Sequence, residues 1–130
     1  MDDCIFCKII DRQVPGLIIA ETDQAIVFVS RENHPLVVPK QHIKDIYELD
    51  EATGSALMTE LIKTAKAVKK GLGCDGVYIT QANEPAGGQE VFHLHFHVYP
   101  RWNDVTRNQV ELRDDSERQI TMEKVKAEYE

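Results

Sequence analysis

Three of the five histidines in this 130-residue chain stand at alternate positions, as His93, His95 and His97. Alternate residues of an extended strand share one face, so a strand over residues 91–99 would align the three imidazoles. The strand rise separates successive imidazoles by about 6.6 Å, which is too far for a direct hydrogen bond but lets two rings hold one phosphate. Neutral imidazole is also a nucleophile toward phosphorus near pH 7. The pattern therefore indicates chemistry on a phosphoryl group.

Two cysteines near the start of the chain, Cys4 and Cys7, form a Cys-x-x-Cys pair. Such a pair is compatible with half of a zinc site, with a redox motif, or with two inert thiols on a short helix over residues 3–10. A tetrahedral zinc ion would need two further ligands. The third cysteine, Cys74, is expected to be a small packing or turn residue, and three cysteines do not indicate a disulfide framework.

The other residues predict an α+β domain that would position these groups. Runs rich in β-branched and apolar residues predict strands near residues 17–21, 25–29, 36–38, 76–82 and 91–99. The first two are joined by a tight turn and should pair antiparallel. A loop with Pro85, Gly87 and Gly88 precedes the last strand and could expose backbone amides to an anion.

One long helix is expected to begin after Asp50, which is a suitable N-cap. Its apolar residues recur at helical spacing, and Met58 in that stripe is expected in the core. Gly71 and Gly73 are expected to stop the helix. A second, acidic and amphipathic helix is expected in the tail, over about residues 115–128.

Length and composition indicate one domain over residues 1–130, of which 42% are hydrophobic. The formal net charge of −7 argues against nucleic acid as a partner, because phosphate backbones require a positive surface. Any anionic small substrate would have to be held by local donors. No apolar run reaches the length of a membrane span, and the acidic start is unlike a signal peptide. We therefore expect a cytoplasmic protein with no membrane partner.

Several segments together resemble one known family. The run His-Leu-His-Phe-His-Val at 93–98 matches the pattern of the histidine triad (HIT) family of nucleotide hydrolases and transferases. Residues 4–10 resemble the zinc-binding opening of many bacterial members, and residues 34–42 resemble their central strand and the turn after it. Asn83 with the Gly-Gly-Gln at 87–89 resembles the loop that leads into the triad strand. The resemblance covers residues 4–101 in order.

The resemblance implies a HIT-like fold with core residues 4–101, in which an antiparallel sheet of about five strands packs on one long helix, with short terminal helices. It implies a homodimer formed through that helix and an adjacent strand. It also implies that His42 and His93 complete a Zn²⁺ site with Cys4 and Cys7. Because a metal on His93 would lie roughly 6 Å or more from groups bonded to His95, such a zinc would brace the active site and would not activate water.

The resemblance also implies roles for the other polar residues. His95 is expected to be the nucleophile, and His97 to bond the phosphate oxygens. Gln89 is expected to orient the leaving-group bridge or the water. Substrate contacts are expected from Asn83, Gly88 and His34, the last of which could also support the triad.

These roles describe an enzyme that cleaves at the α-phosphate of dinucleoside polyphosphates or nucleoside phosphoramidates. A purine nucleotide would be transferred to His95 as a covalent intermediate, and water would then release a nucleoside monophosphate. Pro100-Arg101 after the triad resembles the dinucleoside polyphosphate hydrolases more than the phosphoramidases. Two alternatives remain open: a nucleotidyl transferase or phosphorylase that uses another acceptor, and a non-catalytic nucleotide-binding regulatory module.

Overall fold

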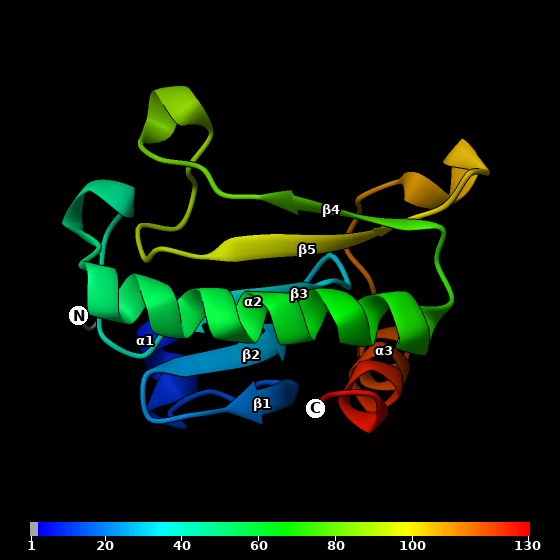
Figure 1. The fold of residues 1–130 in the computed structure, drawn as a ribbon, viewed down its shortest axis with the longest axis horizontal. Coiled ribbons are helices and arrows are strands. Elements are labelled where there is room, and N and C mark those ends of the chain that lie inside the picture. The colour runs from blue at the N-terminus through cyan, green and yellow to red at the C-terminus, as the bar shows by residue number, and fades with distance from the viewer. Residues whose placement is uncertain (1–2) are drawn as a thin grey trace.

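A computed structural model describes residues 3–130. Its centre is a five-stranded antiparallel sheet in the order β1-β2-β3-β5-β4 (Figure 1). The strands are β1 (Ile18–Glu21), β2 (Ala25–Val29), β3 (Pro35–Pro39), β4 (Gly76–Thr80) and β5 (Phe96–Arg101). This sheet confirms the predicted α+β architecture, including the antiparallel pairing of the first two strands.

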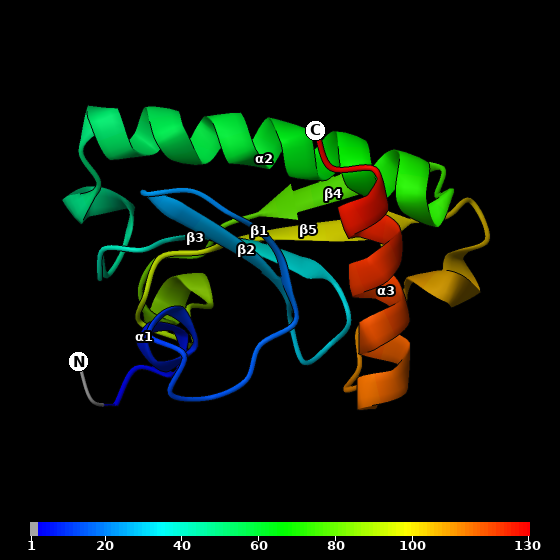
Figure 2. The ribbon, with the colours of Figure 1, turned by 90° about the horizontal axis from the view of Figure 1, so that it is seen from below.

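Helices cover both faces of the sheet (Figure 2). The long helix α2 (Glu51–Leu72) crosses one face, and the short helix α1 (Ile5–Ile10) lies on the other. The tail helix α3 (Asp115–Ala127) packs against α2 and the first two strands at one end of the sheet. No helix among residues 3–130 is long and apolar enough to cross a membrane.

Both predicted ends of α2 are largely confirmed. The Asp50 side chain accepts a hydrogen bond from the Thr53 amide at 2.7 Å, as an N-cap does. Gly73 ends the helix in the left-handed region, at φ 62°. The expectation that Gly71 also stops the helix is wrong, because Gly71 lies within its last turn. Its missing side chain serves another purpose, since a Cβ there would stand 2.6 Å from the Lys124 carbonyl oxygen of α3.

The apolar stripe of α2 is narrower than its spacing suggested. Leu57, Leu61 and Val68 are buried against the sheet, whereas Met58 is 51% exposed. The expectation that Met58 belongs to the core is therefore wrong. Each position advances about 100° around a helix, so a residue next to a buried one turns toward its flank.

Alternate side chains of β2 enter two separate cores. Val27 and Val29 join the core under α2, while Ile26 and Phe28 join the one under α1. All five residues of β2 are buried, and so are all five of β3. A sheet covered on both faces explains why these strands are continuous apolar runs.

Only the last histidine of the triad lies in β5, which corrects the prediction of one strand over residues 91–99. The strand begins at Phe96, so His93 and His95 lie in the segment before it. There the Leu94 amide donates to the Ile43 carbonyl at 2.7 Å instead of joining the sheet. The ring centroids of His95 and His97 lie 4.8 Å apart, closer than the regular strand spacing predicted.

Candidate active site and metal centre

Four side chains converge between α1, the turn after β3 and the triad segment. The ligand atoms of Cys4, Cys7, His42 and His93 all lie within 4.8 Å of one another. The Cys4 sulfur is 3.3 Å from Nδ1 of His93, and the Cys7 sulfur is 3.3 Å from Nδ1 of His42 and 3.5 Å from Nδ1 of His93. A tetrahedral zinc with ordinary Zn–S and Zn–N bonds separates sulfur from nitrogen by about 3.5 Å. The cluster therefore has the size and donors of a Cys₂His₂ zinc site.

The local fold aims these ligands. Cys4 is the N-cap of α1, and its sulfur accepts from the Cys7 amide at 3.3 Å. His93 is fully buried, and its Nε2 donates to the Pro39 carbonyl at 2.8 Å, which leaves the Nδ1 lone pair facing the thiols. Burial and the neighbouring Cys4 thiol raise the pKa of Cys7 to about 11. A metal bound here would displace the thiol protons, because zinc binds the thiolate.

His95 presents one ring nitrogen to an open pocket. Its Nδ1 is 2.7 Å from the His93 carbonyl oxygen, which can only accept, so Nδ1 carries the proton. In the neutral ring the lone pair is then on Nε2. Burial lowers the pKa of His95, which keeps the ring neutral at pH 7. The ring of Phe6 from α1 packs nearly perpendicular to the same imidazole, with ring centroids 5.0 Å apart. The His95 ring is therefore held in a fixed orientation, with an unprotonated Nε2.

His97 is the end of a chain of polar side chains. Its Nδ1 lies 2.8 Å from Nε2 of His34, whose Nδ1 lies 3.1 Å from the Ser30 hydroxyl. Burial lowers the pKa of His34 to about 3 and that of His97 to about 4. The ring of Tyr99 stacks on His97, with centroids 5.3 Å apart, and lies tilted against His34, with centroids 4.1 Å apart. His34 thus supports His97 from behind.

A hollow of about 660 Å³, which we call the triad pocket, opens in front of these histidines. One wall is apolar and comes from α1 and β2, with Phe6, Ile9 and Phe28 among its residues. His95 and His97 also line the pocket. Size and lining suit a flat apolar ring system with an anionic group at one end, because small-molecule pockets combine an apolar surface with a few placed polar groups.

The loop before the triad is internally bonded. Gly88 lines the triad pocket, with φ 96°. The amides that were expected to face an anion donate within the loop instead, Gly87 and Gln89 to the Glu84 carbonyl and Gly88 to the Pro85 carbonyl. That expectation is wrong, because the 3-10 turn Pro85–Gly87 uses these donors itself.

The side chains of Gln89 and Asn83 also have partners within the protein. Gln89 lines the triad pocket, but its amide accepts from the Glu84 amide and donates to the Lys44 carbonyl, both at 2.7 Å. Asn83 accepts from the Ile46 amide at 2.8 Å and exchanges hydrogen bonds with Gln81. Their predicted contacts with a substrate stay predictions, and both side chains hold the loop in place.

Two roles in the site were not predicted from the sequence. Ser30 begins the polar chain behind His97, and Arg118 of α3 lines the triad pocket. Arg118 donates to the Ser30 carbonyl at 2.9 Å and to the Val29 carbonyl at 3.2 Å, so it ties the tail helix to the end of β2. Arg118 and Ser30 lie almost 90 residues apart in the sequence, so no local sequence pattern predicts their contact.

Comparisons with known proteins agree with this fold. The family model for the HIT domain matches residues 11–104, and the chain belongs to this family. A Hit-like protein of Bartonella henselae has a similar structure, with a TM-score of 0.89 at 30% identity, over 98% of this chain and 97% of that one.

Two further relatives carry chemical information in their names. A Zn-bound histidine triad family protein of Mycobacterium smegmatis has a TM-score of 0.85 at 28% identity, over 98% of this chain and 93% of that one. The adenosine 5′-monophosphoramidase of Schizosaccharomyces pombe is 31% identical over 78% of this chain and 76% of its own. The family thus includes nucleotide hydrolases, and this chain has a Cys/His cluster able to hold a metal.

Proposed function

We propose that this protein hydrolyses nucleotides at the α-phosphate, through a nucleotide bound covalently to His95. One observation carries the proposal. The hydrogen bond from Nδ1 of His95 to the His93 carbonyl leaves the Nε2 lone pair free beside the triad pocket. Burial lowers the pKa of His95, so that this lone pair is available at neutral pH. The relative named as a monophosphoramidase supports the same class of reaction.

The reaction has two displacements at phosphorus. Nε2 of His95 forms a bond to the α-phosphorus while the bond to the leaving group breaks, and the leaving group departs with its electron pair and takes up a proton. Water then attacks the same phosphorus, the P–N bond breaks, and the nucleoside monophosphate is released with His95 restored. The covalent intermediate divides one difficult displacement into two easier ones.

His97 would donate a hydrogen bond to the phosphate, and the chain of Ser30 and His34 would set which ring nitrogen of His97 carries the proton. The Ser30 hydroxyl already accepts from the His34 amide, so it can donate its own hydrogen to Nδ1 of His34. His34 then donates from Nε2 to Nδ1 of His97, and His97 carries its proton on Nε2. This order of donors gives a neutral His97 one N–H for the phosphate oxygens.

Zn²⁺ fits the Cys4, Cys7, His42 and His93 cluster by donor type and by spacing. Bound there, it would supply a structural cross-link between α1 and the triad segment. A His93 held by the metal would also fix the orientation of the His95 ring, because the His93 carbonyl is the partner of His95 Nδ1. We therefore propose a bracing metal that stands apart from the reacting phosphate.

The test compares the unaltered chain with His95→Ala and His95→Asn. The Asn variant keeps an N–H donor near the His93 carbonyl but has no nucleophilic nitrogen. AMP released from diadenosine tetraphosphate and from adenosine 5′-phosphoramidate is measured by chromatography, and circular dichroism checks the fold. We expect release by the unaltered chain only. Residual activity above about a tenth in a folded variant would show that His95 is not the nucleophile, since losing a covalent nucleophile costs far more than tenfold.

The same experiment separates the two alternatives. A nucleotide-binding module would bind both compounds and release no AMP at any concentration. A transferase or phosphorylase would form product only when phosphate or a sugar phosphate is added.

A further inference from the structure

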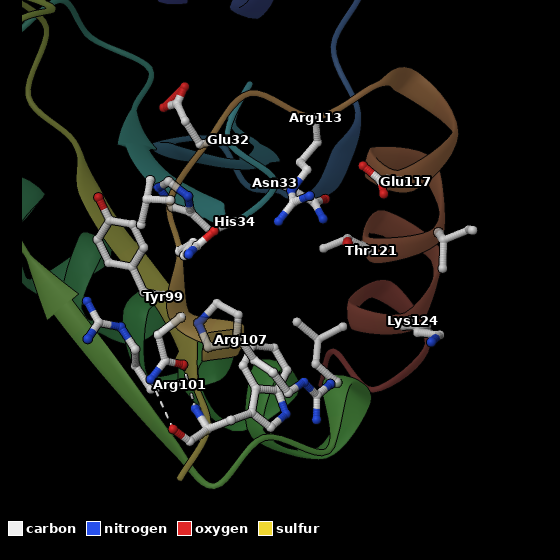
Figure 3. Close-up of a pocket in the computed structure, with 17 residues that line it drawn as sticks. Glu32, Asn33, His34, Tyr99, Arg101, Arg107, Arg113, Glu117, Thr121 and Lys124 are labelled. Atoms are coloured by element: carbon white, nitrogen blue, oxygen red, sulfur yellow. Dashed lines mark hydrogen bonds between the residues drawn. The ribbon is translucent and has the colours of Figure 1, made fainter. Parts of the chain in front are cut away.

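The segment after residue 104, where the match to the HIT domain ends, returns to the neighbourhood of the triad. We call residues 105–130 the tail, and residues 30–34, which join β2 to β3, the β2–β3 turn. Figure 3 shows Glu117 of the tail and Asn33 of the turn lining one hollow of about 390 Å³. The match to the family assigns no role to the tail, so its role follows from its own contacts.

The tail donates hydrogen bonds to three consecutive backbone carbonyls where β2 ends. Arg118 donates through Nε to the Ser30 carbonyl at 2.9 Å and through Nη2 to the Val29 carbonyl at 3.2 Å. The backbone amide of Arg113 donates to the Arg31 carbonyl at 3.0 Å. Backbone carbonyls at the end of a strand need donors from outside the ladder, and here the tail supplies them. These bonds fix the path of the chain from β2 into the turn.

The β2–β3 turn is only partly stabilised by its own interactions. The Ser30 amide donates to the His34 carbonyl at 2.8 Å, and the Asn33 amide donates to the Ser30 carbonyl at 3.1 Å. Asn33 is held in the left-handed region, at φ 70°, and its Oδ1 is buried without a hydrogen-bond partner in the described part of the chain. A left-handed residue and an unpaired buried acceptor both destabilise the turn. The hydrogen bonds from the tail offset this loss.

The turn carries the first two groups of the hydrogen-bonded chain that ends at His97. The Ser30 hydroxyl is 3.1 Å from Nδ1 of His34, and Nε2 of His34 is 2.8 Å from Nδ1 of His97. Ser30 and His34 are both buried, so bulk water does not replace a lost partner.

The position of the Ser30 hydroxyl decides the direction of these hydrogen bonds. If Ser30 moved away, the proton of the neutral His34 ring would be free to occupy Nδ1, and Nε2 of His34 would become an acceptor. His97 would then carry its proton on Nδ1 and present a lone pair to the triad pocket, where the phosphate needs a donor. The N–H that His97 offers therefore depends on how firmly the turn is held.

We propose that Arg118 is a positioning residue for the reaction: by holding the carbonyls of Val29 and Ser30, it keeps the proton of His97 on Nε2. The inference rests on the proposed function, in which that N–H donates to the phosphate. It adds the tail to the phosphate site, although the tail lies outside the matched HIT domain. A guanidinium suits this role, because its planar fork of donors bridges two neighbouring carbonyls in a fixed geometry.

The test follows the proton of His97 and the reaction rate in the same variants. ¹⁵N NMR of histidine-labelled protein shows which ring nitrogen carries the proton, and the loss of signals in His97→Gln identifies those of His97. The unaltered chain should show His97 protonated on Nε2 alone, and Arg118→Ala should show a mixture of the two tautomers. Single-turnover release of AMP should fall about ten- to hundredfold in Arg118→Ala, because a small displacement of a group that holds the substrate slows the chemical step.

Two further variants separate positioning from charge and from folding. Asp115→Asn is the matched control, because it removes the 97% exposed ion-pair partner of Arg118 and leaves both bonds to the carbonyls. Its tautomer and its rate should equal those of the unaltered chain. Arg118→Lys keeps the charge and loses the fork, so it should recover only part of the rate. It also provides the comparison if thermal unfolding shows that Arg118→Ala does not fold.

Adenosine binding separates positioning from direct contact, because Arg118 also lines the triad pocket and adenosine has no phosphate for His97. Calorimetry should give the same adenosine dissociation constant, within about twofold, with and without Arg118→Ala. Weaker adenosine binding with an unchanged His97 tautomer would mean that Arg118 touches the nucleoside, which would overturn the positioning role. A normal rate and tautomer in Arg118→Ala would overturn it too, while the hydrolase stands. An unaltered chain that releases no AMP would overturn the proposed function, and the His97 tautomer would still decide what Arg118 holds in place.

Discussion

His93 is the residue that joins the two halves of the site. Its Nδ1 faces the thiols, its Nε2 donates to the Pro39 carbonyl, and its own carbonyl accepts from His95. Every polar atom of its side chain is therefore committed, and the ring is fully buried. Under the proposed function, a fixed His93 would fix the nucleophile two residues later, and a metal bound by the cluster would act on the reaction by holding the backbone.

Removing one thiol tests this arrangement at the residue scale. Cys7→Ser replaces a zinc ligand by a hydroxyl, which binds zinc poorly, so bound zinc should fall well below one ion per chain and the melting temperature should drop by several degrees. The rate of the first turnover should fall less than in His95→Ala.

Cys74→Ser is the control, because Cys74 is buried away from the cluster, and it should keep the metal. Zinc by mass spectrometry, thermal unfolding and single-turnover kinetics give the three readings. A chemical step lost as completely as in His95→Ala, in folded Cys7→Ser protein, would mean that the metal takes part in the reaction.

At the scale of elements, the sequence correctly predicted those whose bounds depend on residues close by in the chain. The helix α2 carries its own cap at Asp50 and its own stop at Gly73, so its bounds follow from local rules. The triad segment was predicted as strand because its residues alternate, yet two of its histidines precede β5. Their geometry depends on partners far along the chain, namely Pro39 for His93 and the thiols of α1. The same holds for the His34–His97 pair, whose members are 63 residues apart.

The crossing of α2 and α3 depends on the absence of one side chain. Gly71→Ala would bring a methyl group to 2.6 Å from the Lys124 carbonyl oxygen, which is backbone and cannot rotate away. The helices must then separate, and we expect a loss of about 1–3 kcal/mol in the free energy of unfolding despite alanine's better helix propensity. Gly76→Ala is the matched control, because its Cβ would meet nothing within 4 Å. Urea unfolding of both variants measures the difference, and equal stabilities would show that the crossing can adjust.

At the scale of the whole molecule, the two edges of the sheet differ. β1 lies at one edge, and β4 at the other is partly exposed, with Tyr78 49% and Ile79 42% accessible. The exposed side of α2 adds Met58 and Ile62, which are about half exposed. A second copy of the chain could cover the β4 edge and this side of α2 together, as the HIT resemblance implies. An unpaired strand edge next to apolar side chains favours pairing with another chain.

We therefore expect a dimer in solution that depends on β4. Ile79→Lys places a charge on the exposed edge and should raise the dimer dissociation constant by at least about tenfold, as desolvating an unpaired charge is costly. Analytical ultracentrifugation gives the mass of both chains, with Val105→Lys as the control at an exposed residue outside this surface. A monomer in the unaltered chain, or a dimer insensitive to Ile79→Lys, would contradict the prediction.

The shortness of α1 has a consequence for how the triad pocket opens. A helix of six residues does not persist alone in water, so α1 stays ordered through Phe6, Ile9 and the cysteine cluster. The segment that walls the pocket can therefore detach without breaking any strand pairing of the sheet. Entry of a ligand and exposure of the Cys7 thiol would then be two views of one local opening event, and a nucleotide resting against Phe6 would slow the labelling of Cys7 by a thiol reagent.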